Sequence, residues 1–316
     1  MDFRDTSDYH GRIEINLNAF LISLSTVIYG LRIYNRAFMT RTLGLDDGIA
    51  TIAYFLLVVQ SSMDINAVSY GSGAHLRLIP QFLLEKFFYI LVYFCAVAMV
   101  RLAILAFLPR LTSDKRLRFM SLTIAVAILA QTVTVVAYRL TECTSIRDIF
   151  KPPKAPGLHC VGPVAHNRMM VGHAATSVAI DLVLLLLPIW VIYSKMIWSR
   201  RTVRIILVLS VGLFAVITGI IRLALMVTLD FSSDATYQMA TLGIWTNLEG
   251  HIGLWCGCFP ALQPLLRLVS HRLGFRCSLA SRSSNIMYKP DDRGNDHTLG
   301  WRSTTKHDHV HKGSEG

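Results

Sequence analysis

Hydrophobic residues occur along this chain in seven long blocks, separated by shorter segments rich in polar residues. A block of about 20 apolar residues is long enough to cross a bilayer as an α-helix. The pattern therefore predicts an all-α membrane protein, a seven-transmembrane helix bundle. The expected helices are Ile15–Tyr34, Asp47–Val68, Leu83–Leu108, Phe119–Tyr138, Met169–Lys195, Val203–Leu229 and Met239–Leu262.

The composition supports a membrane protein and a single domain. Only 16% of the 316 residues are charged and 53% are hydrophobic, whereas about 25% charged residues is usual for a soluble domain. Because no long polar linker divides the blocks, we expect one transmembrane domain over residues 15–268. The protein is thus expected to be an integral, multi-pass protein of the plasma membrane or an endomembrane.

The two ends of the chain are more polar than the middle. Residues 1–14 are expected to form an extracellular N-terminal segment without a cleaved signal peptide, since no basic stretch leads into a short apolar core. Residues 269–316 lack periodicity, which predicts a disordered cytoplasmic tail. The tail carries His307, His309 and His311. Short histidine-rich tracts can bind metal, but a solvated tail is the favoured interpretation, and no metal site is expected.

Basic residues in the connecting segments predict the orientation in the membrane. They are concentrated after the third and fifth predicted helices, whereas none lies between the sixth and seventh. Arg147, Lys151 and Lys154, between the fourth and fifth helices, weaken this contrast without reversing it. By the positive-inside rule, the N-terminus lies outside and the C-terminus is cytoplasmic. The residues concerned are Arg110, Lys115, Arg116, Arg118, Lys195, Arg200, Arg201 and Arg204.

The same residues explain the net charge of +11. Lys and Arg beside helix ends attract anionic headgroups, so membrane lipids are expected partners. Nucleic-acid binding would require a basic surface on a soluble domain. Since the chain offers no such domain, nucleic acid is not an expected partner.

Two of the six cysteines, Cys143 and Cys160, lie between the fourth and fifth predicted helices, on the expected outer face. That face is oxidising, and a disulfide here would stabilise the fold by about 3 kcal/mol in the chain-entropy model. We therefore predict a disulfide, with two free thiols as the alternative. Cys95, Cys256 and Cys258 are expected to be packing residues.

Several predicted helices contain ionisable residues. A charge in hydrocarbon is costly, so such residues usually face the bundle interior and a partner. Arg222 of the sixth helix can meet either Asp181 of the fifth or Glu249 of the seventh, and the sequence does not decide between them. Arg101 is expected to lie deeper, in the cytoplasmic third of the third helix. The candidate ligand pocket, open to the outer face, comprises Asp64, Tyr93, His173, Asp181, Arg222, Trp245 and Glu249.

These residues allow three interpretations. In the first, the pocket orients a ligand. In the second, the charges form only an interhelical ion-pair network that fixes packing. In the third, Asp181 or Glu249 is catalytic, because burial raises a carboxyl pKa towards the range that a general acid requires. No cofactor is expected. A retinal chromophore in particular needs a lysine in the last helix, and Met239–Leu262 contains none.

An ordered set of residues and short motifs runs through the chain: Gly44–Asp47, Tyr70–His75, Arg101, Cys143, Cys160, Asp181, Pro188, Arg222, Ser233–Tyr237, Trp245, Glu249, Pro260 and Arg267. This set resembles that of the fungal rhodopsin-domain integral membrane proteins, a family that includes Pth-type receptor-like proteins and membrane proteins of mycotoxin clusters. Gly48 and Ala103 depart from the family pattern. The resemblance covers about residues 18–268 and implies seven helices and a receptor-like architecture.

Two classes of function follow. A receptor-like protein associated with a secondary-metabolite gene cluster would take a small apolar ligand from the outer face and contact a cytoplasmic signalling partner through its basic segments. A membrane-embedded isomerase, cyclase or hydrolase, or an accessory protein, would act on an apolar biosynthetic intermediate. Transport is less favoured, because the first three helices do not visibly repeat in the last three.

Overall fold

The computed structural model describes residues 11–69, 80–111, 115–143, 160–195, 202–228 and 235–272. This part of the chain contains seven α-helices, one short π-helix and no β-strand, which confirms the all-α prediction. The elements are α1 (Gly11–Tyr34), the π-helix η2 (Asn35–Met39), α2 (Leu45–Ser69), α3 (Pro80–Leu111), α4 (Lys115–Thr141), α5 (Pro163–Lys195), α6 (Thr202–Thr228) and α7 (Ala235–Arg272).

Most helices extend beyond the apolar blocks that predicted them. The fifth helix begins at Pro163 instead of Met169, and the third begins at Pro80 instead of Leu83. Proline suits the first position of a helix, because its missing N–H would have no partner there and its φ is already helical. The predicted bounds were therefore too narrow, since they followed hydrophobicity rather than backbone geometry.

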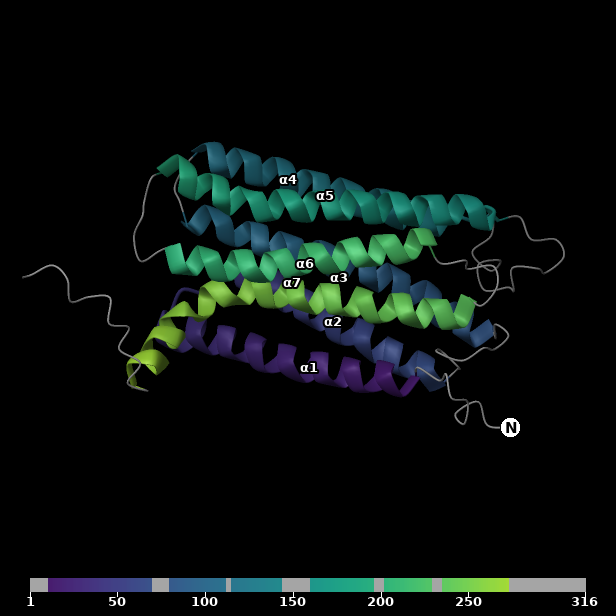
Figure 1. The fold of residues 1–316 in the computed structure, drawn as a ribbon, viewed down its shortest axis with the longest axis horizontal. Coiled ribbons are helices and arrows are strands. Elements are labelled where there is room, and N and C mark those ends of the chain that lie inside the picture. The colour runs from purple at the N-terminus through teal and green to yellow at the C-terminus, as the bar shows by residue number, and fades with distance from the viewer. Residues whose placement is uncertain are drawn as a thin grey trace, which may run out of the picture.

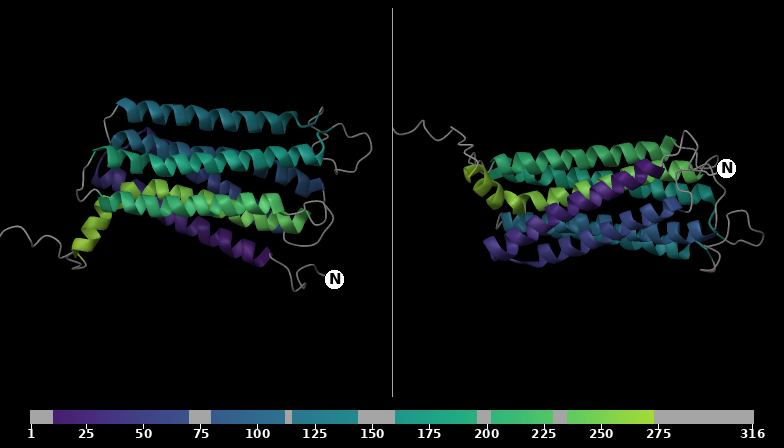
Figure 2. Two further views of the ribbon diagram at one scale, coloured as in Figure 1. Left: turned by 45° about the horizontal axis from the view of Figure 1, so that its top comes forward. Right: turned by 90° about the horizontal axis from the view of Figure 1, so that it is seen from below.

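The helices run side by side in one bundle, with α4 and α5 at one side and α1 at the other (Figures 1 and 2). Helices α3 and α7 are central: they pack on each other, α3 also packs on α2 and α4, and α7 also packs on α1, α2 and α6. Any side chain that points inward from α3 or α7 can therefore reach several neighbouring helices.

The C-terminal end of α7 bends away from the bundle (Figure 1, yellow-green). Pro260 and Pro264 lie in this part of the helix. A proline inside a helix removes one backbone hydrogen bond and clashes with the preceding turn, which bends the helix.

Among the described residues, five helices, α1 to α5, are long and apolar enough to cross a membrane. Within α6, Gly212–Thr228 forms a shorter apolar segment. Large hydrophobic side chains lie exposed on the outside of the bundle, among them Phe20, Phe55, Phe119 and Phe214, while many polar side chains are buried. Soluble proteins rarely expose so much contiguous apolar surface. The fold is that of a membrane protein.

The predicted disulfide between Cys143 and Cys160 is confirmed, with 4.1 Å between the two Cα atoms. Next to it, the Val161 backbone N–H donates to the Glu142 carbonyl oxygen at 2.8 Å. The bond joins the end of α4 to the start of α5. The connection is thus fixed at both of its ends.

The Glu142 side chain forms a small ionic cluster beside this disulfide. One carboxylate oxygen is paired with Arg139, and the other lies 2.8 Å from Nδ1 of His166. Partial burial tends to raise the pKa of the Glu142 carboxyl, but the hydrogen bond from His166 and the charges of Arg139 and His166 outweigh it and hold this pKa below its usual value. The cluster adds a second link between α4 and α5.

Some features that the sequence analysis used lie outside the described residues. They are the first ten residues of the N-terminal segment, Tyr70–His75, the basic residues within 144–159, Arg200 and Arg201, Ser233 and Asp234, and the tail from residue 273.

Candidate functional site

Four charged side chains from four different helices meet in the interior of the bundle. We call Arg101 of α3, Asp181 of α5, Arg222 of α6 and Glu249 of α7 the charged quartet. Arg101 donates from Nε to Asp181 Oδ1 at 2.8 Å and from Nη2 to Oδ2 at 2.7 Å. Arg222 donates from Nε to Glu249 Oε2 at 2.6 Å. The structure therefore pairs Arg222 with Glu249 and gives Asp181 a different partner.

The expectation that Arg101 lies apart from Asp181 is wrong. The expected helix starts placed Arg101 deeper in the bundle than Asp181, but α5 begins earlier than expected. In the structure, Arg101 lies 21 residues after Pro80 and Asp181 lies 18 residues after Pro163. At 1.5 Å per residue these positions are at similar depths, and the long arginine side chain spans the remaining difference.

The two ion pairs are linked. Nη2 of Arg101 lies 3.5 Å from Oε1 of Glu249. Arg101 also donates from Nη1 to the Ser177 hydroxyl at 3.1 Å and from Nη2 to the Ser177 carbonyl oxygen at 3.4 Å. With two positive and two negative side chains, the quartet carries no net charge, so each buried ion is compensated.

Two further pocket candidates lie against the quartet. The Arg222 guanidinium carbon lies 5.5 Å from the centre of the Tyr93 ring, within range of a cation–π interaction. The Tyr93 ring centre lies 6.1 Å from that of His173, and the Phe94 ring centre lies 4.6 Å from His173. The structure thus brings together Tyr93, His173 and three members of the quartet that the sequence had proposed as pocket residues.

Trp245 and Asp64 are placed differently. Trp245 is half-buried on α7, one helical turn before Glu249. Asp64 of α2 belongs to a separate group of polar side chains between α1, α2 and α7, where its Oδ2 accepts hydrogen bonds from Asn18 at 3.2 Å and Asn247 at 2.7 Å. Asn247 and Glu249 are two residues apart on α7 and therefore point to different sides of that helix. This geometry keeps Asp64 apart from the quartet.

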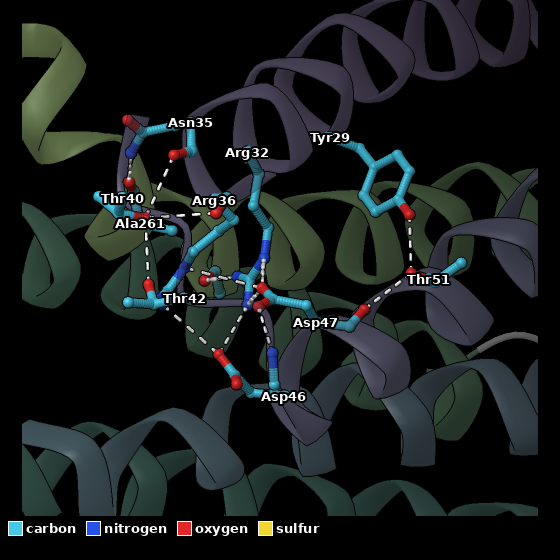
Figure 3. Close-up of polar contacts among 12 residues, drawn as sticks. Tyr29, Arg32, Asn35, Arg36, Thr40, Thr42, Asp46, Asp47, Thr51 and Ala261 are labelled. Carbon is cyan, nitrogen blue, oxygen red and sulfur yellow. Dashed lines mark hydrogen bonds and ion pairs between the residues drawn. The ribbon is translucent and has the colours of Figure 1, made fainter. Parts of the chain in front are cut away.

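Arg32 forms an interaction that the sequence analysis missed (Figure 3). Its side chain is fully buried at the end of α1. It donates to Asp46 at 3.2 Å, to Asp47 at 2.9 Å and to the Gly257 carbonyl oxygen of α7. Nearby, Asn35 of η2 donates to the Ala261 carbonyl oxygen. Side chains from the end of α1 and from η2 thus connect these elements to α2 and to the part of α7 that contains Pro260.

The sequence does contain a signal for the Arg32 interaction. Asp46 and Asp47 open α2 only a short distance along the chain from Arg32, and opposite charges at the adjacent ends of consecutive helices are natural partners. Asp47 has a second function, since its Oδ2 accepts from the Gly44 backbone N–H at 3.2 Å. Such a bond caps the start of a helix.

His251 of α7, which the sequence had suggested as a lining residue of the outer half of the bundle, contacts α1 and α2. Its Nδ1 lies 2.6 Å from the Ser25 hydroxyl and its Nε2 lies 3.0 Å from the Ser61 hydroxyl. Trp255 donates to the same Ser25 oxygen at 2.8 Å. The Trp255 indole can only donate, so Ser25 Oγ accepts from it and its own proton can be donated to Nδ1 of His251; in that tautomer Nε2 donates to Ser61. His251 is a buried connection between α1, α2 and α7.

The geometry constrains the chemistry of the quartet. Both carboxylate oxygens of Asp181 accept hydrogen bonds from Arg101, so neither is positioned to donate a proton to a substrate. Glu249 Oε1 lies 3.5 Å from Arg101 and is therefore bound less closely than either oxygen of Asp181. Among the described residues, no group of three or more His, Cys, Asp or Glu side chains could hold a metal ion. The arrangement suits binding and coupling of helices better than acid catalysis by Asp181.

Comparison with known proteins places the chain among fungal membrane proteins. It is 25% identical over 162 residues to "Fugralins biosynthesis cluster protein 2" of Gibberella zeae; the match covers 51% of this chain and only 39% of that relative. It is 23% identical over 310 residues to "Wortmanamides biosynthesis cluster protein C" of Talaromyces wortmannii, which covers 88% of this chain and 80% of that relative. The family model of the fungal rhodopsin domain matches residues 31–268, which include the whole quartet. The chain therefore belongs to the fungal rhodopsin domain family.

Proposed function

We propose that this protein is a receptor-like membrane protein that binds a small, largely apolar ligand and serves fungal secondary metabolism. The observation that carries the proposal is the charged quartet, in which α3, α5, α6 and α7 each supply one interacting side chain. The link to secondary metabolism is supported by the printed names of the two relatives, both biosynthesis cluster proteins.

The quartet has the geometry of an element that can exist in two arrangements. Nη2 of Arg101 is 2.7 Å from Asp181 and 3.5 Å from Glu249, so a small shift would strengthen one contact at the expense of the other. Such a shift would move α3 and α5 relative to α7. A ligand with unequal affinity for the two arrangements would change their populations, which is what a receptor requires.

The proposed topology has seven membrane-spanning helices, with the N-terminus outside and the basic segments facing the cytoplasm. Lipids would cover the exposed apolar side chains, and the basic segments would contact a cytoplasmic signalling partner. Retinal is not part of the proposal, since α7 contains no lysine for a Schiff base.

A membrane-embedded enzyme or an accessory protein acting on an apolar intermediate is the second candidate, and the relatives' names also favour it. In that case Glu249 is the better acid, because its Oε1 is less engaged than either oxygen of Asp181. Transport of such a compound is a third, less favoured role.

Gene deletion in the host separates these candidates. The deletion strain is complemented with the wild-type gene, Asp181→Asn or Glu249→Gln, and protein levels are matched. Glu142→Gln serves as a control, because it removes an acid outside the quartet. Metabolites are measured by mass spectrometry and cluster transcripts by sequencing.

A receptor predicts that transcripts and their whole set of metabolites change together in the deletion strain and in both quartet variants. An enzyme predicts that one intermediate accumulates while transcripts remain normal. The latter result would overturn the receptor proposal. If transcripts and metabolites are unchanged in both quartet variants, the quartet is required for neither function.

A further inference from the structure

Among the residues that the structure describes, three buried atoms in or beside the quartet that can donate have no hydrogen-bond partner: Nη2 of Arg222, the Tyr93 hydroxyl oxygen and Nδ1 of His173. Their residues are only 1%, 3% and 8% exposed. Buried polar groups are nearly always hydrogen-bonded, so several exceptions in one place require an explanation. We call these three residues the acceptor site.

The three residues come from three helices, and Tyr93 contacts both of the others. Arg222 of α6 lies over the ring of Tyr93 from α3, and the Tyr93 ring contacts that of His173 from α5. Arg222 is held in place from the other side, because its Nε donates to Glu249. The Nη2 donor of the same guanidinium has no hydrogen-bond partner among the described residues and is available to a ligand.

The available groups favour a hydrogen-bond acceptor. An arginine can only donate, a tyrosine hydroxyl donates well, and a histidine ring nitrogen can do either. A charged acceptor would disturb the balance of the quartet, since a third buried negative charge would face only two arginines. An uncharged oxygen accepts the same hydrogen bonds without that cost.

Apart from the quartet, the acceptor site is bordered by apolar side chains. Tyr93 packs in a cluster with Phe94, Val97 and Val135, and Met169 and Met170 of α5 pack against this cluster. Methionine side chains adapt to ligands of different shape. The complete site thus combines hydrogen-bond donors with an adaptable hydrophobic wall.

We propose that Arg222, Tyr93 and His173 bind the carbonyl oxygen of an uncharged, otherwise apolar ligand, such as a ketone, ester or amide. This inference rests on the proposed ligand-binding function and specifies the chemical class of the ligand. Carbonyl binding at Arg222 would act directly on the Arg222–Glu249 pair, and through Glu249 on Arg101.

The test uses the full chain in nanodiscs of uncharged lipid and follows thermal unfolding. The probes are decan-2-one, decane and decanoate, which have similar chains but carry a carbonyl, no polar group and a charge, respectively. Decan-2-one should raise Tm at lower concentrations than either decane or decanoate. Tyr93→Phe, which removes one hydroxyl group, should weaken this effect about tenfold.

Tyr54→Phe is the matched control, because the Tyr54 hydroxyl already has a partner, the Thr26 hydroxyl at 2.9 Å. It should leave the response to decan-2-one unchanged. A ligand-free measurement checks the same geometry: Tyr93→Phe should not lower Tm, whereas Tyr54→Phe should, since only the latter breaks a hydrogen bond.

Four outcomes of this experiment would overturn the inference. Equal shifts from decane and decan-2-one would mean an apolar site only, and a larger shift from decanoate would mean an anion site. An unchanged response of Tyr93→Phe, or the absence of any shift, would also reject it.

If the ketone fails to bind but Asp181→Asn and Glu249→Gln still abolish the transcript response, only the ligand class is wrong. If the ketone binds and those variants change nothing in the host, the proposed function fails and the acceptor site stands.

Discussion

Arg101 on α3 donates two parallel hydrogen bonds, of 2.8 and 2.7 Å, to the carboxylate of Asp181 on α5. Such a bidentate arrangement is among the strongest that an arginine and a carboxylate form. Its position in the middle of the bundle makes it a measurable contributor to both stability and coupling between helices.

Removing one member of this pair should be more harmful than removing both. Asp181→Asn alone leaves the Arg101 guanidinium without its main counter-charge, which should reduce stability by about 3–5 kcal/mol. The double variant Arg101→Met with Asp181→Leu should lose less, because no uncompensated buried charge remains from this pair. Unfolding of the purified protein in detergent measures both. If the losses from Arg101→Met alone and from Asp181→Leu alone add up to the loss of the double variant, the pair is not coupled.

Arg32 should be similarly sensitive to substitution. After Arg32→Met, the arginine that remains beside Asp46 and Asp47 among the described residues is Arg36, whose nitrogens lie 3.5 and 3.8 Å from them. A loss of about 3–5 kcal/mol is expected. Arg36→Met should cost less, since Arg36 is partly exposed and its contacts are longer. Thermal unfolding of the two variants provides the comparison, and an equal loss would argue against the buried cluster.

Reduction of the disulfide between Cys143 and Cys160 should lower the stability of the protein by about 3 kcal/mol. The bond closes the connection between α4 and α5, so its loss frees that segment in the unfolded chain more than in the folded one. Tm is measured with and without reductant. Cys143→Ser should abolish the effect of reductant on Tm, whereas Cys95→Ser, at a free cysteine, should preserve it.

The Glu142 cluster predicts a dependence of stability on pH. The pKa of this carboxyl is lowered in the folded protein from its ordinary value of 4.5. A lowered pKa means that the carboxylate stabilises the fold above about pH 4.5 and that this contribution is lost as the pH falls through the folded value. Tm between pH 3 and about pH 7 should therefore fall more at the acid end for wild type than for Glu142→Gln. Parallel curves would contradict this prediction.

Two glycine substitutions should have opposite effects. A Cβ at Gly250 would lie 2.6 Å from Cδ2 of the buried Leu57, so Gly250→Ala should overpack the contact between α7 and α2 and cost about 1–3 kcal/mol. A Cβ at Gly172 of α5 would meet nothing within 4 Å, so Gly172→Ala should stabilise the helix by about 0.5–1 kcal/mol. Thermal unfolding of both variants measures the difference in sign.

The sequence by itself determined the helical membrane fold, because the hydrophobic blocks are long enough to span a bilayer and few residues within them are charged. It also determined the disulfide, since Cys143 and Cys160 lie in one short connection. The costly charges Asp181, Arg222 and Glu249 could be assigned to the interior for the same energetic reason.

Only the tertiary structure decided how these charges pair. The pairing depends on where each helix starts, how far each long side chain reaches and which sides of the helices face one another. A start of α5 at Pro163 brings Asp181 level with Arg101, and the direction of Asn247 separates Asp64 from the quartet. The pattern of hydrophobic residues along the chain says little about helix starts, side-chain reach or helix rotation. Many helix positions and rotations bury the same apolar surface.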